Sequence, residues 1–91
     1  MRHNPNLFDI ESADPCKCII KGFQTSVSGI LLREFVNSTI AAHFTPETAK
    51  KTRVLCGGYA TVASVIFQTE AQAEKFIICT GGTLTWPYSA T

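Results

Sequence analysis

The segment Ala60-Thr-Val-Ala-Ser-Val-Ile-Phe67 and its continuation, Gln68-Thr-Glu-Ala-Gln-Ala-Glu-Lys-Phe-Ile77, decide the fold. In the first segment, side chains alternate between two faces, which predicts a β-strand with one buried face. In the second, Thr69 and Gln72 have the spacing of a capping box, which indicates the start of a helix. The residues of this helix that we expect to face inward are Ala73, Phe76 and Ile77.

Similar patterns place a strand and a helix earlier in the chain. Alternation predicts a strand from Cys16 to Phe23. Apolar residues at three- and four-residue steps predict an amphipathic helix that starts at Ser26 or Ser28. This helix either ends at Asn37-Ser38 or continues toward His43. Its expected inward residues are Ile30, Leu31, Phe35 and Val36, with Arg33 and Glu34 pointing away.

Turn residues separate the remaining elements. Thr45-Pro46-Glu47 is typical of a helix start, so we expect a short helical turn there. Residues 52–56 are β-prone, and Gly57-Gly58 predicts a hairpin reversal into the strand at 59–67. Gly81-Gly82 ends the second helix, and residues 83–88 form a last strand that Pro87 brings to its end.

The predicted order is strand, helix, strand, strand, helix, strand. Two amphipathic helices on one face of a four-stranded antiparallel sheet make a two-layer α+β sandwich. We expect this domain to span residues 16–91, with residues 1–15 as an extended lead-in that docks Leu7 and Phe8 on the body. A rival placement puts the second strand at 39–44, but its two alanines are poor strand formers.

This order resembles the RNA recognition motif family over about residues 17–88, which implies a ferredoxin-like βαββαβ sandwich. The resemblance rests on packing positions. They are Val65-x-Phe67 with Ala73 and Ile77 behind it, the small residue Ala63, the first-strand segment Cys18–Phe23, and the helix segment Leu32–Phe35.

The family's usual partner is single-stranded RNA, whose bases stack on aromatic rings of the sheet. The matching outward positions here are Ile19, Val62 and Ser64, and none of them has a ring. The resemblance therefore implies an atypical RNA-binding module that contacts phosphates through basic residues. The candidates are Lys17, Lys21, Lys50, Lys51 and Arg53.

The ring-free sheet face also supports a different interpretation. An apolar face is suited to binding a protein partner or a second copy of the chain. The residues that we expect on this face are Ile19, Val62, Ser64 and Ile66. Recognition motifs of nucleoporins look similar at Gly22-Phe23 and dimerise through the sheet, which makes protein binding the alternative function.

Other classes of function find little support in the sequence. The net charge of +1 creates no general attraction for nucleic acid or membrane, and no apolar run approaches the ~18 residues of a membrane span. The N-terminus lacks a secretory signal, so we expect an intracellular protein, nuclear or cytoplasmic. No nucleophile–base pair or phosphate-binding loop is recognisable, so we expect neither an enzyme nor a cofactor.

The four cysteines and the single tryptophan are expected in the core. Cys16 and Cys18 lack the Cys-x-x-Cys spacing that is typical of structural zinc sites, and they would share a strand face with Ile20. We therefore predict buried thiols rather than a metal site. Trp86 shares a strand face with Leu84, which predicts that its ring is buried.

Overall fold

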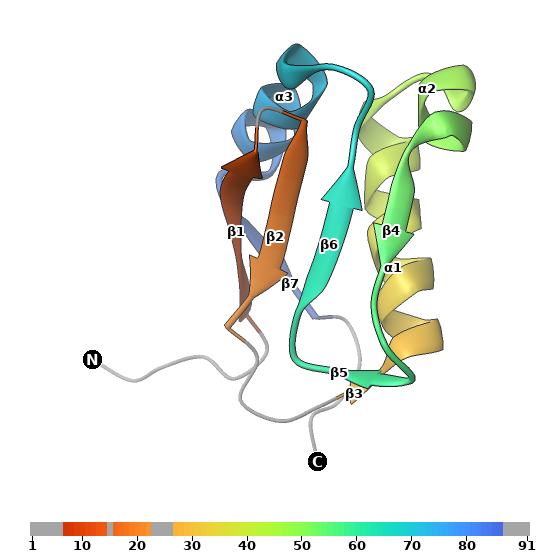
Figure 1. Ribbon diagram of the computed structural model, residues 1–91, viewed down its shortest axis with the longest axis vertical. Coiled ribbons are helices and arrows are strands. Elements are labelled where there is room, and N and C mark those ends of the chain that lie inside the picture. The colour runs from red at the N-terminus through yellow and green to blue at the C-terminus, as the bar shows by residue number, and fades with distance from the viewer. Residues whose placement is uncertain (1–6, 15, 23–26, 87–91) are drawn as a thin grey trace.

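The computed structural model describes residues 7–14, 16–22 and 27–86 of the chain (Figure 1). The strands are β1 (Leu7–Asp14), β2 (Lys17–Lys21), β3 (Val27–Ser28), β4 (Arg53–Leu55), β5 (Tyr59–Ala60), β6 (Ala63–Ile66) and β7 (Thr83–Thr85). The helices are α1 (Gly29–His43), α2 (Pro46–Lys51) and α3 (Glu70–Thr80).

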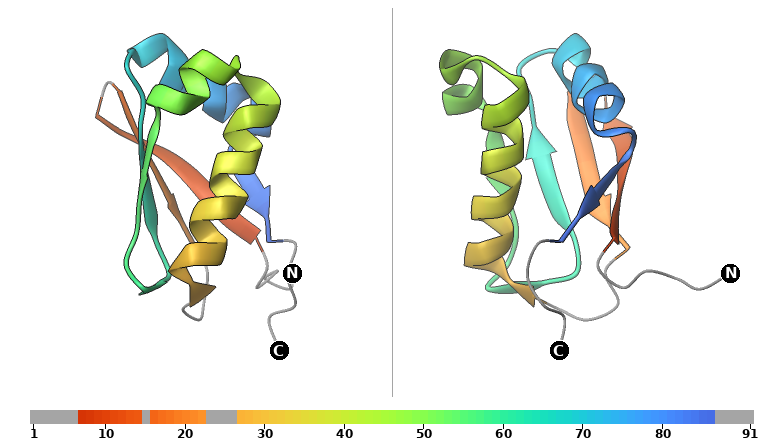
Figure 2. Two further views of the ribbon diagram at one scale, coloured as in Figure 1. Left: turned by 90° about the vertical axis from the view of Figure 1, so that its right-hand side faces the viewer. Right: turned by 180° about the vertical axis from the view of Figure 1, so that it is seen from behind.

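Five strands form one antiparallel sheet in the order β4-β6-β2-β1-β7, and the helices lie on one side of it (Figure 2). The predicted α+β architecture with an antiparallel sheet is confirmed, but the predicted count of four strands is wrong. The additional strand is β1, which comes from the segment expected to be a lead-in. In β1, Phe8 and Ile10 are buried while Asp9 and Glu11 are exposed, and this alternation gives the strand one apolar face.

The position of β1 between β2 and β7 determines the direction of the last strand, β7. β7 runs antiparallel to β1, β1 to β2, and β2 to β6, so β7 runs antiparallel to β6. In a four-stranded sheet with β7 beside β2, β7 would run parallel to β6, and α3 would have to return along the length of the sheet. Here α3 lies at the end of the sheet where β6 finishes, and it connects the two strands there (Figure 1).

The core lies between the sheet and the helices. Cys18, Ile20 and Val65 of the sheet are 0% exposed, as is Phe76 of α3. In α1 the buried stripe is Leu32, Val36 and Ile40, at four-residue steps. The predicted inward face was therefore partly wrong. Because α1 continues to His43, the buried stripe extends to Ile40. With this stripe toward the sheet, Ile30 is 70% exposed, and Leu31 and Phe35 pack at the border of the core.

The caps decide between the predicted helix boundaries. Ser28 caps α1, which ends at His43, so residues 39–43 are helical and the rival strand there is excluded. Thr45 caps α2, and Pro46 is its first residue. At α3, Thr69 Oγ1 accepts a hydrogen bond from the Gln72 amide at 3.2 Å. In return, Gln72 Oε1 accepts one from the Gln68 amide at 3.0 Å.

The turn after β4 is more elaborate than the predicted hairpin. β5 pairs with β3 instead of continuing into β6, which begins at Ala63. The Gly29 amide donates to the Gly58 carbonyl at 2.8 Å, so the start of α1 lies directly on this turn. A Cβ atom at Gly29 would lie 1.8 Å from the Gly57 carbonyl oxygen, and only glycine permits such an approach.

Trp86 is buried, as predicted. The residue is 5% exposed, and its ring makes edge-to-face contacts with Phe8 and Phe35, at centroid distances of 5.7 Å and 5.4 Å. The last strand is shorter than expected and ends at Thr85; Pro87 and Tyr88 lie outside the described residues, as does Phe23. Within the described part of the chain, no helix has the length and apolar character needed to cross a membrane.

Candidate binding face on the open side of the sheet

The side of the sheet opposite the helices, here called the open face, is built by the residues that alternate with the core. In its middle row, Leu55, Ser64 and Ile19 are cross-strand neighbours on β4, β6 and β2, and Glu11 of β1 continues the row. The next row, toward α2, contains Arg53, Ile66 and Lys17. The register thus determines which side chains meet on this face.

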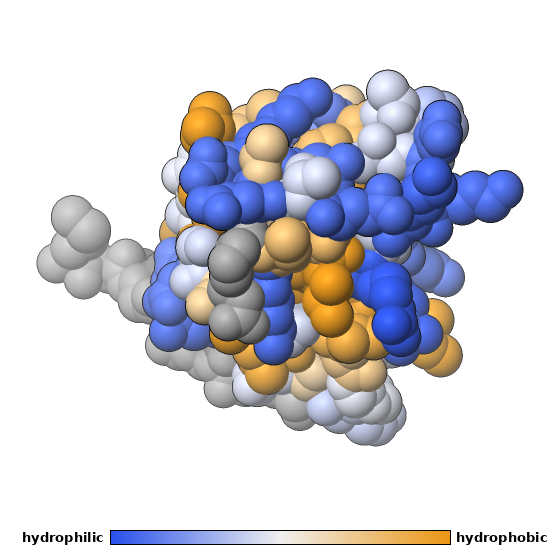
Figure 3. All heavy atoms as spheres, turned by 45° about the horizontal axis from the view of Figure 1, so that its top comes forward, coloured by the Kyte–Doolittle hydropathy of each residue, from blue (hydrophilic) through white to orange (hydrophobic). Residues whose placement is uncertain are grey.

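Apolar side chains occupy the middle of the open face, and we call Ile19, Leu55, Val62 and Ile66 the apolar patch. Leu55 is 42% exposed and Val62 is 46% exposed, while Ile19 and Ile66 are half-buried. Figure 3, which looks onto this face from the α2 end, shows hydrophobic side chains with hydrophilic ones around them.

The structure brings the predicted partner-binding residues Ile19, Ser64 and Ile66 together on adjoining strands, and Val62 lies just before β6. Sequence reasoning missed Leu55. The alternation that buries Val54 was the signal for its outward position.

Two of the predicted basic residues, Lys17 and Arg53, lie on the open face at the end nearest α2. Both are register partners of Ile66, so two strand spacings of about 4.8 Å each separate them, roughly 10 Å in all. Neither forms an ion pair with any acid whose side chain the structure describes. We call Lys17 and Arg53 the basic end.

The opposite side of the face, toward β1, carries charges of both signs. Asp9 is the register partner of Lys21, and Glu11 lies two residues further along β1. Lys21 Nζ is 2.7 Å from Glu11 Oε2, with both side chains about half exposed. Lys21 was predicted to contact phosphate, but here it already has a carboxylate partner.

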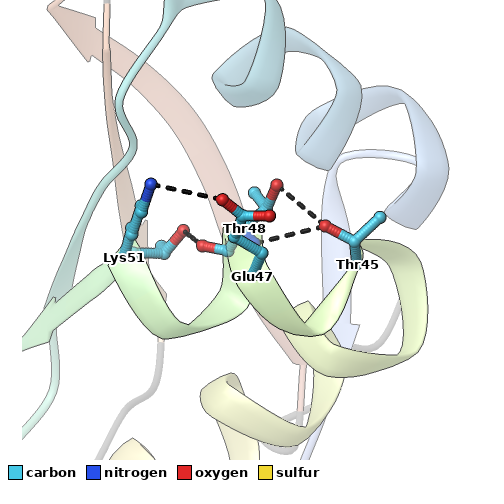
Figure 4. Close-up of polar contacts among 5 residues, drawn as sticks. Thr45, Glu47, Thr48 and Lys51 are labelled. Atoms are coloured by element: carbon cyan, nitrogen blue, oxygen red, sulfur yellow. Dashed lines mark hydrogen bonds and ion pairs between the residues drawn. The ribbon is translucent and has the colours of Figure 1, made fainter.

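The other two predicted basic residues, Lys50 and Lys51, are on α2 and not on the sheet. Lys51 Nζ is 3.5 Å from Glu47 Oε1, an i,i+4 pair on the exposed surface of the helix (Figure 4). Lys50 is exposed on the same short helix, and both lysines lie in its last turn, where they complement the helix dipole. The five predicted phosphate-contacting residues are therefore divided among the basic end, the Lys21–Glu11 pair and α2.

The open face contains no aromatic ring among its described residues, in agreement with the composition at positions 19, 62 and 64. The rings of Phe8, Phe67, Phe76 and Trp86 belong to the core instead. Tyr59, which is 80% exposed, belongs to β5, outside the main sheet.

The cysteines differ in environment more than predicted. Cys18 is fully buried, and its Sγ lies 3.6 Å from the Ala73 carbonyl oxygen, to which it donates; burial raises the pKa of this thiol from 9.0 to about 11. Cys79 is exposed, because it lies on the outer side of α3, so the expectation of a buried thiol is wrong there. Cys16 and Cys56 are half-buried. No group of three metal-binding side chains occurs in the described ranges.

These features make the open face the candidate binding surface, with apolar side chains in its middle and charged ones around them. No protein family model, curated protein or solved structure matches the chain. The function must therefore be argued from the chemistry of this face.

Proposed function

We propose that the protein is a binding module that contacts another protein through the open face of its sheet. The observation that carries this proposal is the apolar patch. Ile19, Leu55, Val62 and Ile66 surround Ser64 on β2, β4 and β6, with Val62 just before β6. Contiguous exposed apolar surface is typical of interaction sites. Each aliphatic side chain of this kind contributes about 1.5–3 kcal/mol when it is removed fully from water.

The ring-free composition of the face favours protein over stacked RNA bases. Stacking on aromatic side chains is worth about 1–3 kcal/mol per base, and Ile19, Val62 and Ser64 offer no such platform. Aliphatic side chains instead pack well against aliphatic or aromatic groups of another protein.

We also propose that the fold is a variant of the ferredoxin-like sandwich found in RNA recognition motifs. Without β1, α2 and the short β3–β5 pair, the chain order is β2, α1, β4, β6, α3, β7, which is the order of strands and helices in that family. In this proposal β1 is an added strand between β2 and β7, which extends the open face and reverses the direction of β7.

A photo-crosslinking experiment tests the proposed function. Benzoylphenylalanine replaces Leu55 on the open face or, as the matched control, Ile78, which is 77% exposed on α3. After irradiation of cells that produce the chain, we expect discrete protease-sensitive adducts from position 55 and none from position 78. An added Ile19→Lys substitution should abolish the adducts from position 55.

The proposal fails if position 55 yields no adduct, or if both positions yield the same adducts. Adducts that ribonuclease removes would show that the face contacts RNA instead. Circular dichroism of each variant establishes that loss of an adduct does not reflect loss of the fold.

RNA binding through phosphates is the second candidate function, and the basic end is the observation that favours it. Lys17 and Arg53 lie roughly 10 Å apart on one face, without a described acidic partner. If they contact phosphates of a random-sequence single-stranded RNA, binding should weaken with salt, and the slope of log K against log salt concentration measures this. The Lys17→Gln and Arg53→Gln substitutions should each make that slope less steep by about 0.7. Arg33→Gln, on the exposed side of α1, is the matched control and should leave it unchanged.

A further inference from the structure

We infer that the open face binds an amphipathic α-helix of another protein, and that this helix carries acidic residues along the side that lies over β4. The inference rests on the proposed function and adds the chemical class of the partner. It depends on the dimensions of the apolar patch, on the strand pairing beneath the patch and on the charges around it.

The apolar patch is longer along the strands than across them. Ile66 and Val62 are four residues apart in the chain, which is about 13 Å of extended backbone. Across the strands, Leu55 and Ile19 flank Ser64 on either side, so they lie two strand spacings apart, roughly 10 Å. An α-helix with its side chains is about 10–12 Å wide, and about nine of its residues span 13 Å. A short helix that lies along β6 therefore matches the patch in both directions.

The strand pairing beneath the patch favours a helix over an extended segment. β6 pairs with β4 and β2, and β2 pairs with β6 and β1, so both strands have neighbours on either side. A partner that lies on the patch must therefore satisfy its own backbone N–H and C=O groups. An α-helix does so within one segment. A second sheet would also do so, but it would pack over several strands and bury the charged side chains of β1.

The charges around the patch determine which side of the partner helix is acidic. Toward β1, Lys21 forms an ion pair with Glu11. Lys17 has Asp14 as its register partner on β1. On the other side of the patch, Arg53 is exposed on the edge strand β4 and forms no ion pair with an acid whose side chain is described. The unbalanced positive charge thus lies on the β4 side, where a carboxylate of the partner complements it.

The covered face of the same sheet shows which apolar pattern such a helix needs. The stripe of α1 that packs there consists of Leu32, Val36 and Ile40, at four-residue steps. Helices that bind another protein through one apolar side use anchors at the same three- and four-residue steps. We therefore expect this spacing in the partner, with Asp or Glu residues along one edge of its stripe.

The crosslinking experiment, extended by mass spectrometry, tests this inference. Digestion of the adduct formed from position 55 identifies the segment of the partner that contacts the open face. We expect apolar residues at three- and four-residue steps in this segment, with Asp or Glu beside them. A synthetic peptide of the segment should bind the native full chain, and its helical circular dichroism signal should increase when it binds.

A charge exchange tests the contact with Arg53. Arg53→Glu should weaken binding of the peptide about tenfold in fluorescence anisotropy, because like charges then face each other. A peptide with lysine in place of its acidic residues should bind this variant better than the original peptide does, and this recovery also shows that the variant is folded. Arg53→Lys should retain most of the affinity. Arg33→Glu, on the exposed side of α1, is the matched control and should leave the Kd unchanged.

Several results would overturn the inference but keep a protein-binding role for the face. They are an adduct with a segment of alternating apolar residues, an adduct with a basic helix, an adduct between two copies of this chain, and an affinity that Arg53→Glu leaves unchanged. If position 55 yields no adduct, or yields adducts that ribonuclease removes, the proposed function fails and the inference fails with it.

Discussion

The two faces of β2 place the same residue type in opposite roles. Ile20 is 0% exposed under the helices, whereas its neighbour Ile19 lies half-buried on the open face beside Ser64. Successive side chains of a strand point to opposite sides, so one peptide unit separates the core from the proposed interface. Apolar residues on the covered face stabilise the fold, and those on the open face are available to a partner.

The largest expected effect concerns β1, which decides whether the covered face has four strands or five. Phe8 is 0% exposed and contacts Trp86, so Phe8→Ala should lower the free energy of unfolding by about 3–5 kcal/mol. Leu7→Ala, on the half-buried open side of the same strand, is the control and should cost much less. Urea denaturation measures both; equal small effects would mean that β1 does not belong to the core.

The pair Ile20→Ala and Ile19→Ala tests the contrast between the faces directly. Truncation of the fully buried Ile20 should cost about 2–5 kcal/mol of stability because it leaves a cavity. The same truncation at Ile19 should cost less than Ile20→Ala, and it should weaken binding through the open face. Chemical denaturation measures stability, and crosslinking from position 55 measures binding. A reversed order of stabilities would contradict the assignment of the faces.

The buried thiol of Cys18 should make the stability of the protein depend on pH in the alkaline range. Burial raises the pKa of the Cys18 thiol to about 11 from the 9.0 of the unfolded chain, so the folded state keeps its proton longer. The contribution of the protonated Cys18 thiol to the stability of the folded state is complete below pH 9.0. It is lost as the pH rises toward about 11, because the unfolded chain loses this proton first.

Cys18→Ala should therefore remove part of the decrease in stability over this range. A thiol reagent at neutral pH should modify the exposed Cys79 readily but Cys18 only on unfolding. Denaturation at a series of pH values, with reagent kinetics on the native chain, measures both effects. Rapid modification of Cys18 in the native chain would contradict its burial.

The smallest expected effect is at the rim of the open face. Glu11→Gln removes the ion pair with Lys21, in which both side chains are about half exposed, so stability should fall by about 0–1 kcal/mol. A change in stability larger than that of Ile20→Ala would show that this pair is structural.

Local sequence signals predicted the helices and their limits well. Side-chain caps such as Thr69 with Gln72 are local, since they require only residues three or four apart in the chain. Pro46 at the start of α2, and Gly81 with a φ of +73° at the end of α3, are equally local. The buried stripe of α1 was predicted less well, because which side of a helix faces inward depends on the sheet that it packs against.

The candidate site was predicted in composition but not in arrangement. The alternation in the chain indicated that Ile19, Val62, Ser64 and Ile66 share an outward face, and the residues themselves show that it carries no ring at these positions. The sequence did not reveal that Lys21 pairs with Glu11, because that contact depends on β1 lying beside β2. Five basic residues that look like one group in the sequence are therefore divided in the structure.

From its residues alone, this chain determines where its helices start and stop and which side chains alternate along its strands, because these properties depend on neighbours within a few positions. The tertiary structure alone decides that residues 7–14 join the sheet and that β7 runs antiparallel to β6. It also decides that Lys21 lies beside Glu11 and that Lys17 and Arg53 are both cross-strand neighbours of Ile66. Strand pairing joins segments that are distant in the chain, and the partner and register of each strand follow from how the whole core is packed.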